Sequence, residues 1–239
     1  MNRLETRSPK STTELETARL KLRQWQTSDL EPFAKMNADA RVMEFSPALL
    51  SRAESDAMAE RIQALIAQRG FGFWAAELKA SRAFIGFVGL HIPTAELPFS
   101  PCVEIGWRLA FRFWGQGYAT EAAGEALRFA FAELNLPEIV SFTAVANLRS
   151  QAVMRRLHMQ RQPSTFQHPD IPVGHALREH CWYRLSREEW RQSSRSATAA
   201  PIYRNGPRLC RAKRNNGSMP TTEAASTPPI DSRFDIKAG

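Results

Sequence analysis

The chain has 239 residues, of which 43% are hydrophobic and 23% are charged, so it can bury the core of one globular domain. No apolar run approaches the roughly 18 residues of a membrane span, and the polar residues 1–16 do not resemble a secretory signal. Three widely spaced cysteines form no C-x-x-C pair, which argues against a disulfide framework or a zinc site and favours a reducing cytoplasm.

The net charge of +8 is concentrated near the C-terminus. From residue 192 onward, eight basic and three acidic residues give a net +5, so residues 1–191 carry +3. We therefore do not expect the body of the protein to bind nucleic acid. Residues 192–239 lack apolar periodicity and predict a basic, disordered tail. We expect a flexible N-terminus over 1–14 and one domain over 15–191.

The first part of the domain predicts one strand followed by two helices. Apolar residues alternate from Leu20, which favours a strand. The S-x-x-E spacings that begin at Ser28 and Ser51 are typical of capping boxes, so a helix should start at each. The second helix should end at Gly70, because glycine readily adopts the left-handed turn that terminates a helix.

The middle of the chain predicts a hairpin, a further strand and a long helix. Residues 73–78 and 83–92 are apolar runs separated by a short polar turn. A proline-rich loop leads to a second apolar run at 103–109. Small and apolar residues then recur on one helical stripe over 119–134, so this helix should lie close to a sheet.

The last part of the domain predicts two strands and a short helix. The strands are expected at 139–145 and 182–185, the helix at 150–157, and a closing turn at 187–191. Mixed strands and helices with a hairpin near the start indicate the α+β class, with one central sheet flanked by helices.

The most informative motif lies between the strand at 103–109 and the long helix. It reads R-x-x-G-x-G and comprises Arg112, Gly115 and Gly117. Glycines permit positive φ and a close backbone approach, and the first N–H groups of a helix have no partner within it. The pattern therefore favours phosphate binding, although a turn that only caps the helix would look the same. Neither a P-loop nor a dinucleotide fingerprint is complete here.

Four segments follow one another in a characteristic order: residues 17–23, residues 84–90, the R-x-x-G-x-G loop, and N-x-x-S at 147–150. Together they resemble the GCN5-related N-acetyltransferase (GNAT) family, and most closely its RimJ/RimL-like branch. The resemblance implies a single mixed sheet that is splayed in the middle. It also implies acetyl-CoA as co-substrate, no metal, and direct acetyl transfer to a primary amine in a ternary complex. The acceptor could be a small molecule or a protein N-terminus, and a homodimer is compatible with the family.

The resemblance further implies which residues contact acetyl-CoA. Backbone N–H groups of the loop would face the pyrophosphate, and the strand at 103–109 would pair with the pantetheine like an added strand. The expected contacts are Trp107, Arg108, Leu109, Arg112, Gly115, Gln116, Gly117, Tyr118, Ala119, Thr120, Asn147 and Ser150.

Proton transfer is less clearly assigned by the sequence. The amine must lose a proton, and the leaving thiolate can accept one. Glu104, within an apolar strand, is a candidate general base, with His91 or ordered water as alternatives. Relatives often carry a tyrosine where this chain has Met154, so the hydroxyl of Ser150, beside Asn147, is the candidate catalytic acid.

Two departures from the family keep a second hypothesis open. Met154 has no proton to give, and His158 stands where the family usually has glycine at a left-handed helix end. The protein could instead be a catalytically weak CoA-binding module that docks to RNA or the ribosome through its basic tail. His168, His175 and His180 match no recognised metal-ligand spacing, and we expect their segment to form a loop over the substrate pocket.

Overall fold

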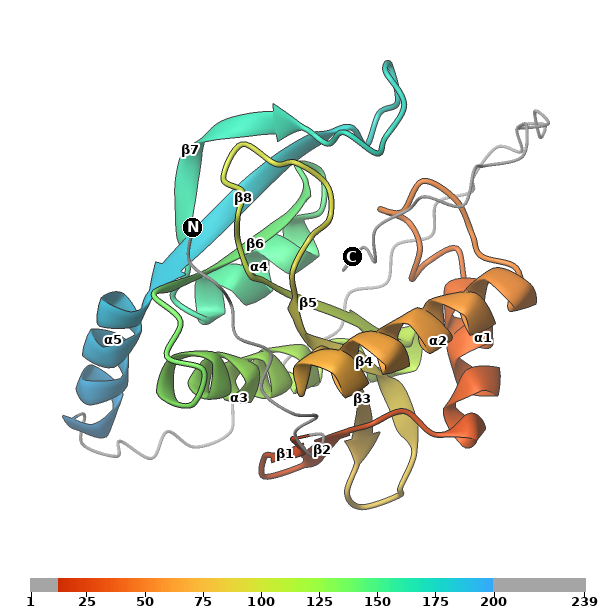
Figure 1. Ribbon diagram of the computed structural model, residues 1–239, viewed down its shortest axis with the longest axis horizontal. Helices are drawn as coiled ribbons and strands as arrows, with labels where there is room; N and C mark the ends of the chain where they lie inside the picture. Colours follow the sequence, from red (N-terminus) through yellow and green to blue (C-terminus); the bar gives the residue numbers. More distant parts are fainter. Residues whose placement is uncertain (1–12, 200–239) are drawn as a thin grey trace, which may run out of the picture.

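The structure is a computed structural model that describes residues 13–199 (Figure 1). Most of the predicted N-terminal segment (1–14) and of the predicted basic tail (192–239) therefore lies outside the described residues. Within residues 13–199, no helix is both long and apolar enough to cross a membrane.

One mixed sheet of eight strands organises the described part of the chain, in the order β1-β2-β3-β4-β5-β6-β8-β7. The strands are β1 (Leu15–Glu16), β2 (Leu20–Arg23), β3 (Phe73–Leu78), β4 (Phe84–His91), β5 (Glu104–Leu109), β6 (Glu138–Ala144), β7 (Gln160–Gln167) and β8 (Glu179–Ser186). Neighbouring strands are antiparallel except β5 and β6, which are parallel. The α+β class and the single mixed sheet are confirmed.

Helices cover both faces of this sheet (Figure 1). They are α1 (Leu30–Asn37), α2 (Arg52–Arg69), α3 (Tyr118–Ala132), α4 (Leu148–Arg156) and α5 (Arg187–Ala199). Phe73 of β3 packs against Phe87, which in turn packs against Phe33 of α1. The next residue, Trp74, packs edge-on against Phe129 of α3. Because successive side chains of a strand point to opposite faces, α1 and α3 lie on opposite sides of the sheet.

Local sequence signals explain most of the helices and strands in the first half of the described chain. The capping box at α2 forms as predicted: the Ser51 N–H donates to the Glu54 carboxylate at 2.7 Å, and the Glu54 N–H donates to the Ser51 hydroxyl at 3.3 Å. Gly70 ends this helix with a φ of 80°. The predicted box at Ser28 does not form. A 3₁₀ turn over Thr27–Asp29 precedes α1, and the Asp29 carboxylate accepts from the Gln26 N–H instead.

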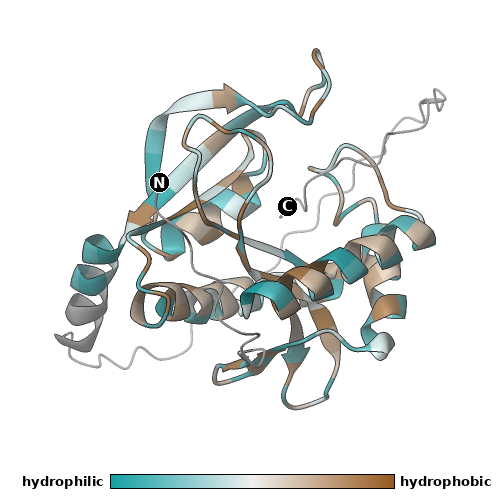
Figure 2. Cartoon of the chain, viewed as in Figure 1, coloured by the Kyte–Doolittle hydropathy of each residue, from teal (hydrophilic) through white to brown (hydrophobic). Residues whose placement is uncertain are grey.

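In the second half of the described chain, the helices and strands differ more from those predicted by the sequence. Strand β7 has no predicted counterpart, and Figure 2 shows it mostly in teal and white. Helix α4 begins at Leu148 with Asn147 as its N-cap, two residues before the predicted start. The predicted closing turn at 187–191 is the beginning of α5, which continues to Ala199, past the expected end of the domain at 191.

The sheet is splayed between β5 and β6. These strands pair in register only at Glu104 and Val140, where the Val140 N–H donates to the Val103 carbonyl at 3.1 Å. The hydroxyl of Ser141 donates to the Ile105 carbonyl at 2.9 Å, and beyond this point β5 pairs only with β4 on its other side. The predicted splay is confirmed, and it exposes one backbone edge of β5.

Candidate active site

The glycine loop leads directly into α3, and its backbone conformation is one that can bind an anion. Gly115 and Gly117 have φ values of 74° and 81°, which side-chain-bearing residues rarely adopt. Gly117 is the N-cap of α3, and its carbonyl accepts the first helical hydrogen bond, from the Glu121 N–H at 3.0 Å. The N–H groups of residues 118–120 precede that bond, so they are available to an anion at the positive end of the helix dipole.

A network from the N-terminal hairpin holds the first turn of α3 in place. The Glu121 carboxylate accepts from the Thr17 hydroxyl at 2.6 Å and pairs with Arg19, also at 2.6 Å. Arg19 donates to the Gln116 carbonyl at 3.0 Å, and its guanidinium lies 4.4 Å from the Tyr118 ring centroid. Arg19 therefore neutralises the one carboxylate in the first turn of α3 and fixes the loop before it.

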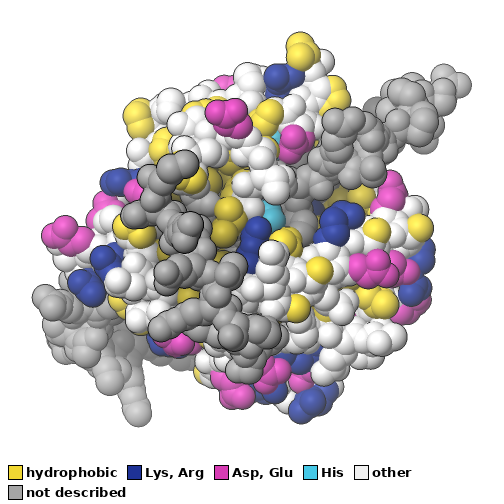
Figure 3. Space-filling view, viewed as in Figure 1, with side chains coloured by type: hydrophobic (Ala, Val, Ile, Leu, Met, Phe, Trp, Pro, Cys, Tyr) yellow, Lys and Arg dark blue, Asp and Glu magenta, His cyan; other side chains and the backbone are white. Residues whose placement is uncertain are grey.

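A cavity of about 780 Å³ opens at the splay. Its walls come from the loop between α1 and α2, from β5, from the glycine loop and the first turn of α3, and from α4. In the space-filling view, hydrophobic and positively charged side chains lie together around the central recess of this face (Figure 3). Ten predicted cofactor contacts line the cavity: Trp107, Arg108, Leu109, Gly115, Gly117, Tyr118, Ala119, Thr120, Asn147 and Ser150.

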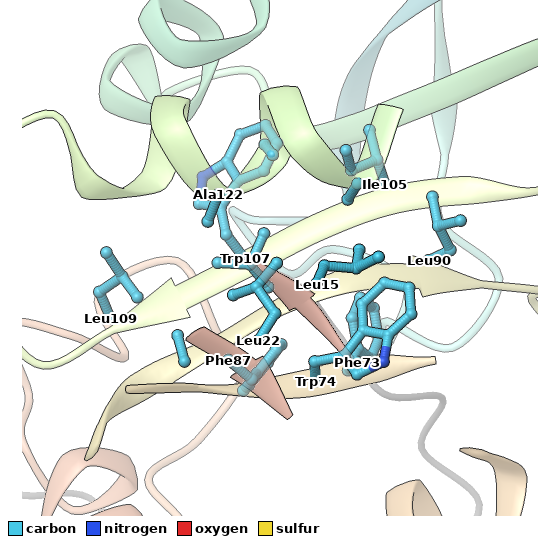
Figure 4. Packing of buried hydrophobic residues seen from close by; sticks show 14 of the residues in the cluster. Leu15, Leu22, Phe73, Trp74, Phe87, Leu90, Ile105, Trp107, Leu109 and Ala122 are labelled. Atoms are coloured by element: carbon cyan, nitrogen blue, oxygen red, sulfur yellow. The ribbon is translucent and has the colours of Figure 1, made fainter. Parts of the chain in front are cut away.

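Three consecutive residues of β5, Trp107 to Leu109, border the cavity. Trp107 extends towards Ala122 of α3 (Figure 4). Arg108 points the opposite way, with its guanidinium 5.5 Å from the Phe87 ring centroid. It donates to the Asn37 side-chain carbonyl at 3.0 Å, and the Asn37 amide donates in turn to the Ser55 hydroxyl at 3.1 Å. Burial lowers the pKa of Arg108 to about 10, so it remains a cation at neutral pH.

Asn147 and Ser150 form a connected pair at the N-terminus of α4. The Asn147 side-chain carbonyl accepts from the Ser150 N–H at 3.1 Å, so Asn147 is the N-cap of α4. The Asn147 amide donates to the Thr143 hydroxyl at 2.9 Å and to the Ser150 hydroxyl at 3.1 Å. Because the Ser150 oxygen accepts from Asn147, its own hydrogen can be donated into the cavity.

Three predicted site residues do not line the cavity walls within the described residues. Glu104 is buried where β5 and β6 meet, directly opposite His91 of β4. Arg112 is exposed, with its guanidinium 4.6 Å from the Phe113 ring centroid. Gln116 is also exposed, and its side-chain amide donates to the Arg112 carbonyl at 3.0 Å.

The predicted site residues do not include the outer wall of the cavity. Val42 and Phe45, in the loop between α1 and α2, line it together with Arg149 of α4. Arg149 pairs with Glu44 of that loop, and its guanidinium lies 4.9 Å from the Trp114 ring centroid and 5.4 Å from that of Phe45. These contacts join segments that lie far apart in the chain, so no local sequence pattern predicts them.

The two departures from the family have distinct structural consequences. Met154 is buried in the hydrophobic core, with 1% of its surface exposed. His158 has a φ of 60°, so the left-handed turn predicted there is present with histidine in place of glycine.

The histidine segment packs against aromatic residues away from the cavity. The rings of His168 and His180 lie 4.9 Å apart and contact Phe142 and Phe166. Among residues 13–199, no three metal-ligating side chains gather into a candidate metal site. His168, His175 and His180 do not line the cavity that the described residues form, and the loop over the substrate pocket stays a prediction.

Comparison with known proteins agrees with this geometry. Residues 19–160 match the family model described as "Acetyltransferase (GNAT) domain", and the chain belongs to that family of acetyltransferases. The acetyltransferase of the GNAT family from Bacillus anthracis has the same fold, with a TM-score of 0.63, 23% identity, and coverage of 74% of this chain and all of that one.

Two curated relatives are also similar in sequence. FsC-acetyl coenzyme A-N(2)-transacetylase from Aspergillus fumigatus is 38% identical over 125 residues, which are 51% of this chain and 52% of the relative. This chain thus aligns with only about half of that protein's length. The uncharacterized N-acetyltransferase YnaD from Bacillus subtilis is 26% identical over 73% of this chain and 97% of its own length.

Proposed function

We propose that this protein is a cytoplasmic, acetyl-CoA-dependent N-acetyltransferase of the RimJ/RimL-like branch. It moves an acetyl group directly to a primary amine, of a small molecule or a protein N-terminus, in a ternary complex. The observation that carries the proposal is the splay between β5 and β6, which opens beside the glycine loop and the N-terminus of α3. Family membership supports acetyl transfer, and the names of the two relatives support nitrogen as the acceptor.

The residues present suit acetyl-CoA, which supplies the acetyl group as a thioester. The N–H groups of residues 118–120 would hold its pyrophosphate, because they lie before the first helical hydrogen bond of α3. The edge of β5 beyond Ile105, freed by the splay, would pair with its pantetheine. Trp107 and Leu109 would pack beside it from the cavity wall.

Direct transfer is favoured because the described cysteines are poor nucleophiles. Burial, with added repulsion from Glu104 and Glu138, raises the pKa of Cys102 to about 12. Burial also raises the pKa of Cys181. A thiol with a raised pKa carries little thiolate at neutral pH, and neither cysteine lines the cavity in the described structure. We therefore propose a direct transfer without an acyl-enzyme.

Two side chains are proposed to move protons. Ser150 donates its hydroxyl hydrogen to the sulfur that leaves, because Asn147 already occupies its oxygen as a donor, and its oxygen regains a proton through water as the proton taken from the amine is released. Glu104 is the proposed base; since it lies behind the cavity wall, the proton from the amine reaches it through ordered water.

The experiment that tests the proposal combines binding and turnover. Calorimetry should detect acetyl-CoA binding by the full chain, and a library of primary amines should release free thiol from acetyl-CoA. Initial rates with both substrates varied should give intersecting lines, as a ternary complex requires. Parallel lines would contradict direct transfer, and a lack of acetyl-CoA binding would contradict the whole proposal.

The second candidate is a CoA-binding module with little turnover, which docks to RNA through its basic tail. Met154 favours it, since this buried methionine cannot supply the proton that a tyrosine gives in many relatives. Acetyl-CoA binding without thiol release from any amine would support it, together with RNA binding that weakens steeply with salt and disappears when the tail, residues 192–239, is removed.

A further inference from the structure

Helix α4 gives the cavity a wall that is rich in arginine. Residues 139–169, which include α4, contain four arginines and neither aspartate nor glutamate. Two of the four, Arg149 and Arg156, line the cavity together with Ala152 and Val153. Spacings of three and four residues place these side chains on one stripe of the helix. The stripe is therefore a basic wall with apolar surface between its two charges.

This stripe of α4 faces the glycine loop. The Arg149 guanidinium lies 4.9 Å from the ring centroid of Trp114, the residue just before Gly115. Residues 118–120, whose N–H groups are proposed to hold the pyrophosphate, line the same cavity, and α3 and α4 are in contact. A nucleotide held at the first turn of α3 therefore lies beside the arginines of α4.

The two arginines of the stripe differ in how their charges are matched. Arg149 is paired with Glu44 of the loop between α1 and α2. Arg156 is exposed and has no carboxylate partner among residues 13–199. It therefore presents an unneutralised positive charge at the cavity wall.

Stabilisation of α4 alone does not account for the position of Arg156. A cation in the last turn of a helix interacts favourably with the negative end of the helix dipole, and both Arg155 and Arg156 lie in that turn. The Arg155 guanidinium lies 3.5 Å from the Tyr183 hydroxyl of β8, and Arg155 does not line the described cavity. Contact with the cavity distinguishes Arg156 from its neighbour.

A cation at this position suits a second phosphate group of the nucleotide. The N-terminus of α3 already offers the pyrophosphate backbone donors and about half a positive charge. A phosphate monoester carries about −1.5 to −2 at pH 7 and has three acceptor oxygens, so it needs a full cation. The planar fork of arginine binds such a group through two parallel hydrogen bonds.

We infer that Arg156 binds the phosphate monoester of the co-substrate, which in acetyl-CoA is the 3′-phosphate of the ribose. This inference rests on the proposed acetyl-CoA-dependent function and names the part of the donor that the protein selects. Arg156 is then a specificity-determining residue that distinguishes CoA from its dephospho form.

Two ligands that differ only in this phosphate test the inference. CoA and 3′-dephospho-CoA share the pyrophosphate, the pantetheine and the base. Calorimetry with the full chain should give CoA an affinity about tenfold higher than that of dephospho-CoA. Raising the salt concentration from about 50 to about 500 mM should narrow the difference, because Arg156 is exposed and its attraction is screened. Neither measurement depends on the acceptor.

Variants at two neighbouring arginines locate the preference. Arg156→Gln removes the charge, so it should lower the affinity for CoA about tenfold and leave that for dephospho-CoA unchanged. Arg156→Lys keeps the charge without the fork and should retain part of the preference. Arg155→Gln is the matched control, because it removes an exposed arginine from the same helical turn but not from the cavity wall. It should leave the preference intact.

The outcomes separate this inference from the function on which it rests. Equal affinities of the unaltered chain for CoA and dephospho-CoA would overturn the inference and leave the acetyltransferase in place, and this comparison needs no variant. A preference that survives Arg156→Gln, or that Arg155→Gln removes equally, would also overturn it. A lack of binding of either ligand would contradict the proposed function itself. Thermal unfolding identifies a variant that fails to fold, and Arg156→Lys then replaces Arg156→Gln.

Discussion

At the residue scale, Ser150 and Asn147 show how one short motif combines structural and chemical work. The cap on α4 uses the Ser150 N–H and the Asn147 carbonyl, whereas the Ser150 hydroxyl takes no part in it. Removing the hydroxyl therefore leaves the cap bond in place. The two roles can be separated by one substitution.

Ser150→Ala should lower kcat about 10- to 100-fold, because a donor to the leaving sulfur is lost. The free energy of unfolding should fall by only about 1 kcal/mol, the cost of the bond from Asn147. Steady-state kinetics and urea unfolding measure the two effects. Ser150→Thr, which keeps a hydroxyl, should recover part of the rate. An unchanged kcat in Ser150→Ala would remove this residue from the mechanism.

At the scale of elements, the glycine loop and α3 act as one unit, and Gly117 is the residue where they join. Its φ of 81° costs an alanine about 1–2 kcal/mol. A Cβ there would lie 3.5 Å from the Arg19 guanidinium, which is an ordinary contact, so the strain lies in the backbone. Gly117→Ala should therefore weaken acetyl-CoA binding about tenfold by calorimetry, as the loop shifts to relieve the strain.

Gly124→Ala provides the control within the same helix. Gly124 lies inside α3, and a Cβ there would meet nothing within 4 Å. Alanine should raise the free energy of unfolding by roughly 0.5–1 kcal/mol and leave acetyl-CoA binding unchanged. Equal effects of the two substitutions on acetyl-CoA affinity would show that the loop conformation is not what holds the nucleotide.

Elements with local signals could be predicted, and elements stabilised by their neighbours could not. The box at Ser51 and the run at 73–78 carry their own signals. Strand β7 is polar and exposed along most of its length, so it forms because β8 offers it an edge. Helix α5 did carry a signal that was missed: Ser186 and Glu189 form a capping box, with the Ser186 N–H donating to the Glu189 carboxylate at 2.7 Å.

The residues of the candidate site also fall into those with a local sequence signal and those without one. Gly117, Asn147 and Ser150 were found because each belongs to a short motif that is visible in the sequence. The bridge between Arg149 and Glu44 joins residues 105 positions apart, and only the folded chain brings them together. The direction of Arg108 depends on α1 packing beside β4, so its position near Asn37 could not be read from the alternation of β5 alone.

At the scale of the whole molecule, a buried ion cluster joins strands β2 and β3 of the sheet to the start of α1. Arg23 of β2 contacts the Asp29 carboxylate ahead of α1 at 2.7 and 2.9 Å, and Glu77 of β3 at 2.7 Å. All three side chains are at most 4% exposed. The pKa of Arg23 is raised, chiefly by the hydrogen bonds that its guanidinium donates to Asp29, and the bond to Glu77 adds to the effect. The cluster therefore fixes where α1, and with it Asn37, meets the sheet.

Breaking this cluster should lower the free energy of unfolding far more than breaking an ion pair on the surface. Arg23→Met leaves the Asp29 carboxylate buried without its cation and leaves Glu77 only its pair with the exposed Arg82, which should lower the free energy of unfolding by about 3–5 kcal/mol. Lys35→Met removes a cation from an exposed pair with Glu31 on α1 and should cause no measurable change. Chemical denaturation compares the two. If the free energy of unfolding falls equally little in both variants, water reaches the cluster and apolar packing alone positions α1.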